Sequence, residues 1–205
     1  FKLPDFAKEF QKAHKLSGGE IIEVSTAKKH YYYVEDLASL KEHLDMLSSY
    51  HNFSFDCEWG GKDVWWGYLR SLQLSWRDHH ALVITFYKEH GEPTELAYAL
   101  AEGHHKKPSY NEDAKVLLYD LFNRNGVTVD GHNGRGDLIW CVEHLELDIM
   151  VEKFSFDTML AHHVINDTLP HDLTYQSKKY TDLGVYDTEL ETWKRDNGVN
   201  EKMLD

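Results

Sequence analysis

The stretch FSFDCEWGG, residues 53–61, has the pattern of a buried strand that ends with two acidic residues, Asp56 and Glu58. Side chains in a strand alternate between its two faces, so these two carboxylates are expected side by side on one face. The opposite face takes the apolar side chains of Phe53, Phe55 and Cys57. Neighbouring carboxylates repel each other and are costly to bury unpaired, so the pair either faces water or shares a cation.

The segments around this strand predict an α/β domain with a mixed central sheet flanked by helices. A strand at 30–34 is followed by a helix whose leucines recur on one face. Alternating patterns at 69–76 and 81–86 predict an antiparallel hairpin. Helices and strands then alternate along the chain, at 111–126, 127–131, 137–147, 154–165 and 172–182. Alternation of this kind after a hairpin is the signature of a sheet with both parallel and antiparallel pairs.

The composition is that of one globular domain, with 205 residues of which 41% are apolar. We expect residues 1–29 to form a peripheral segment and residues 30–205 to form the main domain. No apolar run is long enough to predict a transmembrane helix. The two cysteines lack metal-ligand spacing, which favours a reducing, intracellular compartment over a structural zinc site. A net charge of −13 argues against broad binding to duplex nucleic acid.

A third carboxylate, Asp137, follows the predicted strand 127–131 and opens the next helix. Ligands of α/β sheets gather beyond the carboxyl ends of the strands, so Asp137 is expected near Asp56 and Glu58. Three convergent carboxylates suit a hard divalent cation, Mg²⁺ or Mn²⁺. Two such ions about 3.5–4 Å apart would support hydrolysis of a phosphodiester. The alternative is that Asp137 only stabilises a helix N-terminus.

Four segments in this order resemble the 3′–5′ proofreading exonuclease domain of family-A DNA polymerases, with a likeness to the bacteriophage enzymes. These segments are FDCEW, DGHNGRGDLIW, FDTMLAHHV and LPHDLTYQSKKYTD. The family belongs to the DnaQ-like, ribonuclease-H-like superfamily, and the resemblance covers residues 30–205. It implies a ribonuclease-H-like fold and removal of nucleotides from the 3′ ends of single-stranded DNA with two Mg²⁺ or Mn²⁺ ions.

The resemblance also implies roles for individual residues. Asp56, Glu58 and Asp137 correspond to the catalytic and metal-binding acids of the first two motifs. The residues implied in substrate binding are His132, Asn133, Arg135 and Tyr186. A polymerase domain is expected in the same parent chain, in the cytoplasm of a bacterial or phage-infected cell.

The sequence departs from the family at its third motif, Tyr-x-x-x-Asp, which supplies a fourth carboxylate. The pattern occurs here only at Tyr32 and Asp36, upstream of the first motif and therefore in the wrong place. We expect the fourth ligand beyond Asp205, which would leave the second metal ion weakly held in these 205 residues. A second departure is Gly136, which makes the turn before Asp137 more flexible than a bulkier residue would.

Three alternatives remain open. A related nuclease could trim RNA, or the domain could be a non-catalytic nucleic-acid-binding module of a polymerase. A small-molecule site would need a Gly-rich phosphate loop, for which EWGGKD at 58–63 is a poor match. Trp59, Trp65 and Trp66 could stack on bases or could equally cover the edge of the sheet as core.

Overall fold

The computed structural model describes residues 29–88, 91–100 and 108–181. Its contacts divide the chain into two compact units, and among the described residues these are 29–157 and 158–181. Tyr186 and all but the last residue of the expected peripheral segment 1–29 lie outside the described ranges. None of the described helices has the length and apolar character needed to cross a membrane.

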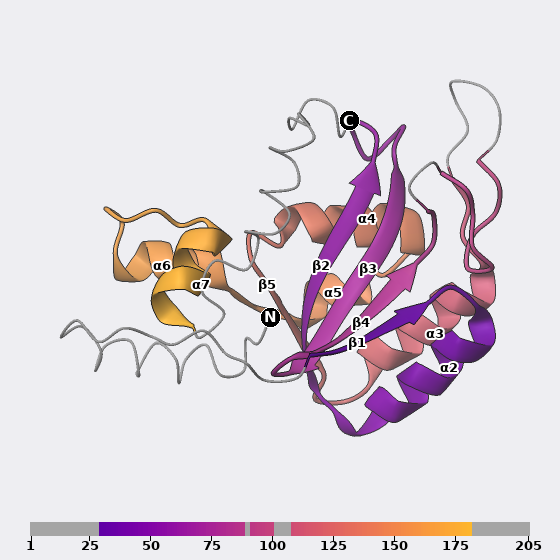
Figure 1. The fold of residues 1–205 in the computed structure, drawn as a ribbon, viewed down its shortest axis with the longest axis horizontal. Helices are drawn as coiled ribbons and strands as arrows, with labels where there is room; N and C mark the ends of the chain where they lie inside the picture. Colours follow the sequence, from indigo (N-terminus) through magenta and orange to yellow (C-terminus); the bar gives the residue numbers. More distant parts are fainter. Residues whose placement is uncertain (1–28, 89–90, 101–107, 182–205) are drawn as a thin grey trace. The chain divides into compact units, whose positions relative to one another are not determined.

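One mixed sheet of six strands forms the centre of the first unit, in the order β1-β4-β3-β2-β5-β6 (Figure 1). The strands are β1 (His30–Val34), β2 (Asn52–Gly60), β3 (Tyr68–Arg77), β4 (His80–Thr85), β5 (Thr128–Gly131) and β6 (Phe154–Asp157). β3 pairs antiparallel with both β2 and β4, and the other three pairs are parallel. The expected hairpin and mixed sheet are confirmed, and the acidic strand β2 occupies an interior position.

Helices fill the connections between the strands as the hydrophobic pattern predicts. The first unit contains α2 (Leu37–Met46), a 3-10 turn η1 (Leu47–Ser49), α3 (Glu112–Asn123), α4 (Arg135–Leu145) and α5 (Ile149–Lys153). The second contains α6 (Thr158–Ile165) and α7 (Leu173–Tyr180). α4 packs on β2 and β3, and α5 packs on β5 (Figure 1). The five-residue α5 was not expected, because it is too short to show a helical period.

The alternation along β2 is the one that the sequence predicts. Phe53, Phe55 and Cys57 are buried, whereas Asp56 and Glu58 are exposed. The Phe53 ring meets Phe122 of α3 edge-on, with 6.4 Å between centroids. Phe55 meets Phe154 in the same way at 6.0 Å. Burial of the aromatic face holds β2 in register, because a slip of one residue would turn both phenylalanines to water and both acids into the core.

The second unit is held together by polar contacts around a buried histidine, His162 of α6. Its Nδ1 lies 2.7 Å from Nδ1 of His171, and its Nε2 lies 3.0 Å from the hydroxyl of Tyr180 in α7. α7 begins at Asp172, whose carboxylate accepts a hydrogen bond from the N–H of Tyr175. The Nε2 of His162 therefore joins α6 to α7, and its Nδ1 joins α6 to the loop before α7.

The glycines before Asp137 give a test of how tightly the start of α4 is built. A Cβ added at Gly136 meets no atom within 4 Å. We expect Gly136→Ala to raise the free energy of unfolding by about 0.5–1 kcal/mol, because alanine restricts the unfolded chain and favours helix. Urea denaturation followed by circular dichroism measures the change.

The matched control is Gly134→Ala, whose Cβ would lie 3.1 Å from the ring of Phe154. This contact is tight, so we expect no gain in stability or a loss. Equal gains in both variants would show that the turn adapts and that its glycines have no packing role.

Candidate active site

The site forms where β2 extends beyond its neighbour β5. The pairing of these strands covers only residues 52–54 of β2. Beyond it, a side chain of α4 takes the place of a strand, since the backbone N–H of Cys57 donates a hydrogen bond to Oδ1 of Asp137 (3.1 Å). The Cys57 and Cys141 sulfur atoms, 3.5 Å apart, add a second contact between β2 and α4. The first two acidic motifs are thereby joined directly.

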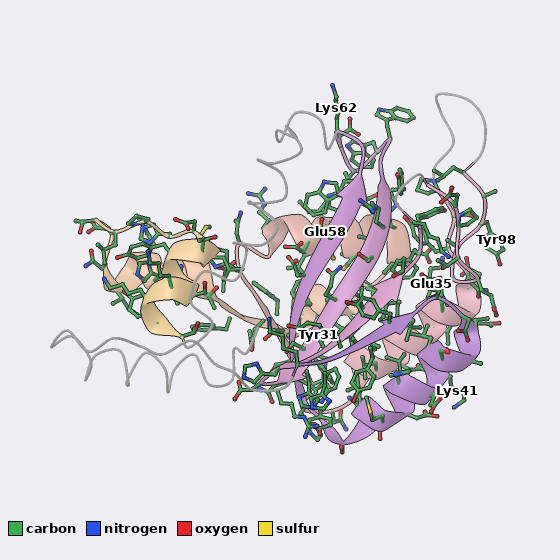
Figure 2. The ribbon with its side chains drawn as sticks, viewed as in Figure 1. Tyr31, Glu35, Lys41, Glu58, Lys62 and Tyr98 are labelled. Atoms are coloured by element: carbon green, nitrogen blue, oxygen red, sulfur yellow. The ribbon has the colours of Figure 1, made fainter. Side chains whose placement is uncertain are left out.

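Asp56 and Glu58 project from the face of β2 opposite to Cys57. They lie directly across from Gln73 and Ser71 of β3, and cross-strand partners share a face. Figure 2 shows Glu58 on the upper half of β2. Asp137 differs from this pair because its side chain is buried at 8% exposure. The structure therefore brings two exposed carboxylates and one buried carboxylate to the same end of β2.

Their pKa values show that the three carboxylates interact. Desolvation is the main cause that raises the pKa of Asp137, to about 7, and the charges of Asp56 and Glu58 raise it further. Desolvation also raises the pKa of Glu58, with a further contribution from Asp56. The pKa of Asp56 is raised by desolvation, against a hydrogen bond from the Cys57 backbone. Such mutual repulsion makes the site a region of negative potential that a cation would relieve.

The chemistry of the donor set fits a hard divalent cation. All three candidates offer carboxylate oxygens, which Mg²⁺ and Mn²⁺ prefer. Across the described ranges, no group of three or more His, Cys, Asp and Glu side chains is placed to hold a metal ion without rearrangement. Asp56 and Glu58 are exposed and can change rotamer to meet a cation, whereas Asp137 is fixed by its hydrogen bond to Cys57.

The loop between β5 and α4 is anchored by Asp157, a residue that the sequence did not single out. Its carboxylate accepts hydrogen bonds from the backbone N–H groups of Asn133 (3.1 Å) and Gly134 (3.0 Å). Asn133 has a left-handed backbone with φ of 55°, which a non-glycine residue adopts at some cost unless the surroundings fix it. The acid at the end of β6 thus fixes the loop that carries the expected substrate-binding residues.

The expected substrate-binding residues fall into two groups. Asn133 and Arg135 are exposed and His132 is half-buried, all in or beside the loop that precedes Asp137. Tyr186 lies outside the described residues. Asp36, which completes the misplaced Tyr-x-x-x-Asp pattern, accepts hydrogen bonds from Ser39 and caps α2. Its role is structural.

The three tryptophans after the first motif fall into two groups. Trp59 stacks on Trp140 of α4, with 5.1 Å between ring centroids and an angle of 11°. Trp65 and Trp66 are more than half exposed, so they are not core residues. Their backbone N–H groups donate to the Asp63 carboxylate, which shapes the turn between β2 and β3. Base stacking remains a prediction for this exposed pair.

A comparison with protein families shows what kind of domain this chain forms. The model of the 3′–5′ exonuclease found in family-A DNA polymerases matches residues 31–204. The chain belongs to this 3′–5′ exonuclease family. Its members are hydrolytic exonucleases, and the resemblance carried by the four motif segments is confirmed. A relative, the DNA polymerase of Escherichia phage T5, is 34% identical over 89 residues, which are 42% of this chain and 10% of the polymerase.

Solved structures share the ribonuclease-H-like fold of this exonuclease domain. The catalytic core of RRP6 from Trypanosoma brucei has a TM-score of 0.58 at 15% identity, covering 98% of this chain and 49% of that one. The Aedes aegypti Nibbler EXO domain has a TM-score of 0.54 at 12% identity, covering 91% and 83%. Escherichia coli RNase D, an exoribonuclease, has a TM-score of 0.52 at 13% identity, covering 85% and 39%. The chain therefore spans about half of the RRP6 core and a tenth of the phage polymerase.

The buried acid makes stability depend on pH. The pKa of Asp137 lies at about 7 in the folded protein, against an ordinary value of 3.8. The folded protein therefore favours the protonated form of Asp137. The stability that this form provides is complete below pH 3.8 and is lost as the pH rises through 7. In EDTA at pH 8, we expect Asp137→Asn to raise the free energy of unfolding by up to roughly 4 kcal/mol, because the amide keeps the acceptor for Cys57 without the charge.

Urea titrations of both proteins from pH 4 to pH 8 measure this gain, which should shrink steadily toward pH 4. A gain that is independent of pH would show that the Asp137 carboxylate does not carry a raised pKa.

Proposed function

We propose that this exonuclease domain removes nucleotides from the 3′ ends of single-stranded DNA in a divalent-metal-dependent reaction, as the proofreading part of a DNA polymerase. The observation that carries the proposal is the meeting of Asp56, Glu58 and Asp137, from the first two family motifs, at one end of β2. The phage polymerase relative supports DNA as the substrate. We also propose a polymerase domain in the same parent chain and activity in the cytoplasm.

Asp56, Glu58 and Asp137 would hold Mg²⁺ or Mn²⁺ in this proposal. When bound, such ions lower the pKa of water and stabilise the leaving oxygen of a phosphodiester. The raised pKa of Asp137 implies that part of this site is protonated near neutral pH without metal, so binding would release a proton. At limiting metal concentration, activity is therefore expected to rise with pH, because ionisation of Asp137 favours metal binding.

The remaining work of the site falls to the loop before Asp137. Asn133 presents an exposed amide that could contact the terminal nucleotide, and Arg135 presents an exposed guanidinium suited to a phosphate. The two hydrogen bonds to Asp157 hold this loop before substrate arrives. A loop fixed in advance loses less entropy on binding, which improves positioning of the scissile bond.

Digestion of a 5′-labelled single-stranded oligonucleotide with Mg²⁺ or Mn²⁺ tests the proposal. We expect a ladder of products shortened from the 3′ end, and a fall of roughly a hundredfold or more in rate for Asp56→Ala, because a metal ligand is lost. A matched RNA oligonucleotide, run in parallel, tests the choice of sugar. Faster digestion of RNA would contradict the DNA assignment and favour the RNA-trimming alternative.

Thermal unfolding tests metal binding without requiring turnover. We expect saturating Mn²⁺ to stabilise the wild-type chain, by about 2.7 kcal/mol at a hundred times the Kd. The effect should be larger at pH 8 than at pH 6, because Asp137 is ionised only at the higher pH. It should be reduced in Asp137→Asn. Failure to stabilise the chain at either pH, together with no digestion, would favour a non-catalytic module.

A further inference from the structure

An irregularity in the sheet places an arginine beside the candidate active site. Glu58 of β2 pairs with Ser71 of β3, but the next residue, Trp59, pairs with Leu69, so Arg70 is the extra residue of a β-bulge. Bulges redirect side chains and are common next to active sites. The Arg70 carbonyl accepts hydrogen bonds from the N–H groups of the two residues after β4, at 2.8 and 3.2 Å. The backbone at the bulge is therefore held by hydrogen bonds from the segment that follows β4.

Arg70 lies close enough to Glu58 for its charge to act on that carboxylate, yet the two do not form an ion pair. Its positive charge lowers the pKa of Glu58, against the effects of desolvation and of Asp56. None of the ion pairs between described residues includes Arg70. The side chain is half-buried, and its Nε is buried without a hydrogen-bond partner in this part of the chain. A guanidinium carries five N–H donors, so the Arg70 side chain can still donate hydrogen bonds to a ligand.

A second unsatisfied atom lies three residues further along the same strand, on Gln73. Gln73 is the direct partner of Asp56, and its amide nitrogen donates to the Ser71 hydroxyl at 2.7 Å. Its Oε1 is buried and has no partner among the described residues. The described ranges contain four such side-chain atoms, and two of them lie on β3 across from the acidic motif. Buried polar atoms are almost always paired, so two on one strand call for a partner, and a bound substrate would supply one.

We propose that Arg70 binds a backbone phosphate of the strand that occupies the carboxylate site, with Gln73 as a neighbouring acceptor for a nucleotide donor. This inference rests on the proposed exonuclease function and adds a substrate contact that lies outside the family motifs. A planar guanidinium matches a phosphate with two parallel hydrogen bonds. A chain with a net charge of −13 and three acids at one site repels a polyanion. The guanidinium of Arg70, beside Glu58, offsets that repulsion at the position where the single-stranded DNA must approach.

Binding of a fluorescein-labelled single-stranded deoxythymidine dodecamer by the 205-residue chain tests the inference. Fluorescence anisotropy is measured in Ca²⁺, whose looser coordination geometry disfavours hydrolysis. We expect Arg70→Gln to weaken the Kd roughly tenfold or more, because a charge-assisted contact is lost. The slope of log affinity against log salt should become shallower by about 0.7, as for one phosphate contact on a single strand. Arg70→Lys should keep the slope and lose part of the affinity.

Arg77→Gln is the matched control, because this substitution removes the same charge. Arg77 is exposed and lies at the far end of the same strand. We expect its Kd to remain within about twofold of wild type. Thermal unfolding of each variant verifies that the fold is retained.

Two outcomes would overturn the inference: wild-type affinity in Arg70→Gln, or an equal loss in Arg77→Gln. The first outcome, with a wild-type chain that binds and digests the oligonucleotide, would leave the exonuclease proposal standing. A wild-type chain that neither binds nor digests it would overturn both. If Arg70→Gln does not fold, Arg70→Lys decides: an unchanged Kd in that variant would exclude bidentate recognition.

Discussion

The hydrogen bond from the Cys57 backbone to the Asp137 carboxylate is the contact on which the candidate site depends. It joins the strand of the first acidic motif to the helix of the second, across 80 residues of sequence. A backbone donor sets the position of Asp137 more firmly than a flexible side chain could. Because Cys57 lies between Asp56 and Glu58 in the chain, the same bond places the buried acid beside the backbone that carries the exposed pair.

This arrangement is costly for the protein alone, and the cation that we propose would offset the cost. Desolvation raises the pKa of all three carboxylates, and the charges of Asp56 and Glu58 raise that of the buried Asp137 further, to about 7. Natural active sites commonly sacrifice stability in this way, because the groups that a reaction needs are those that a stable core would exclude. The bulge at Arg70 and the unsatisfied amide oxygen of Gln73 belong to the same class of cost. The aromatic packing of Phe53 and Phe55 on the other face of β2 acts in the opposite direction and stabilises the strand.

Sequence reasoning reached those features that depend on local pattern. The alternation of Phe55, Asp56 and Cys57 predicted β2 and its two faces, and Asp137 was found because it follows a strand and opens a helix. The bulge could not be predicted, because it depends on the register between β2 and β3, and both strands show regular alternation around it. Asp157 was missed for a related reason: its carboxylate binds backbone N–H groups, whose positions no side-chain pattern records. The five-residue α5 is too short to carry a helical period.

The short pairing of β5 with β2 has a consequence for how the chain avoids wrong partners. A strand edge with unpaired N–H groups is a template on which another chain can add a strand. The pairing with β5 ends at residue 54 of β2, and the carboxylate of Asp137 accepts the backbone N–H of Cys57 beyond it. One side chain thus satisfies a backbone donor at this edge while it helps to build the acidic site. Asp137→Asn keeps the acceptor for the Cys57 N–H. Variants that remove this acceptor would damage the site and also leave a backbone donor of β2 unpaired. A loss of activity in them would therefore combine a catalytic effect with a structural one.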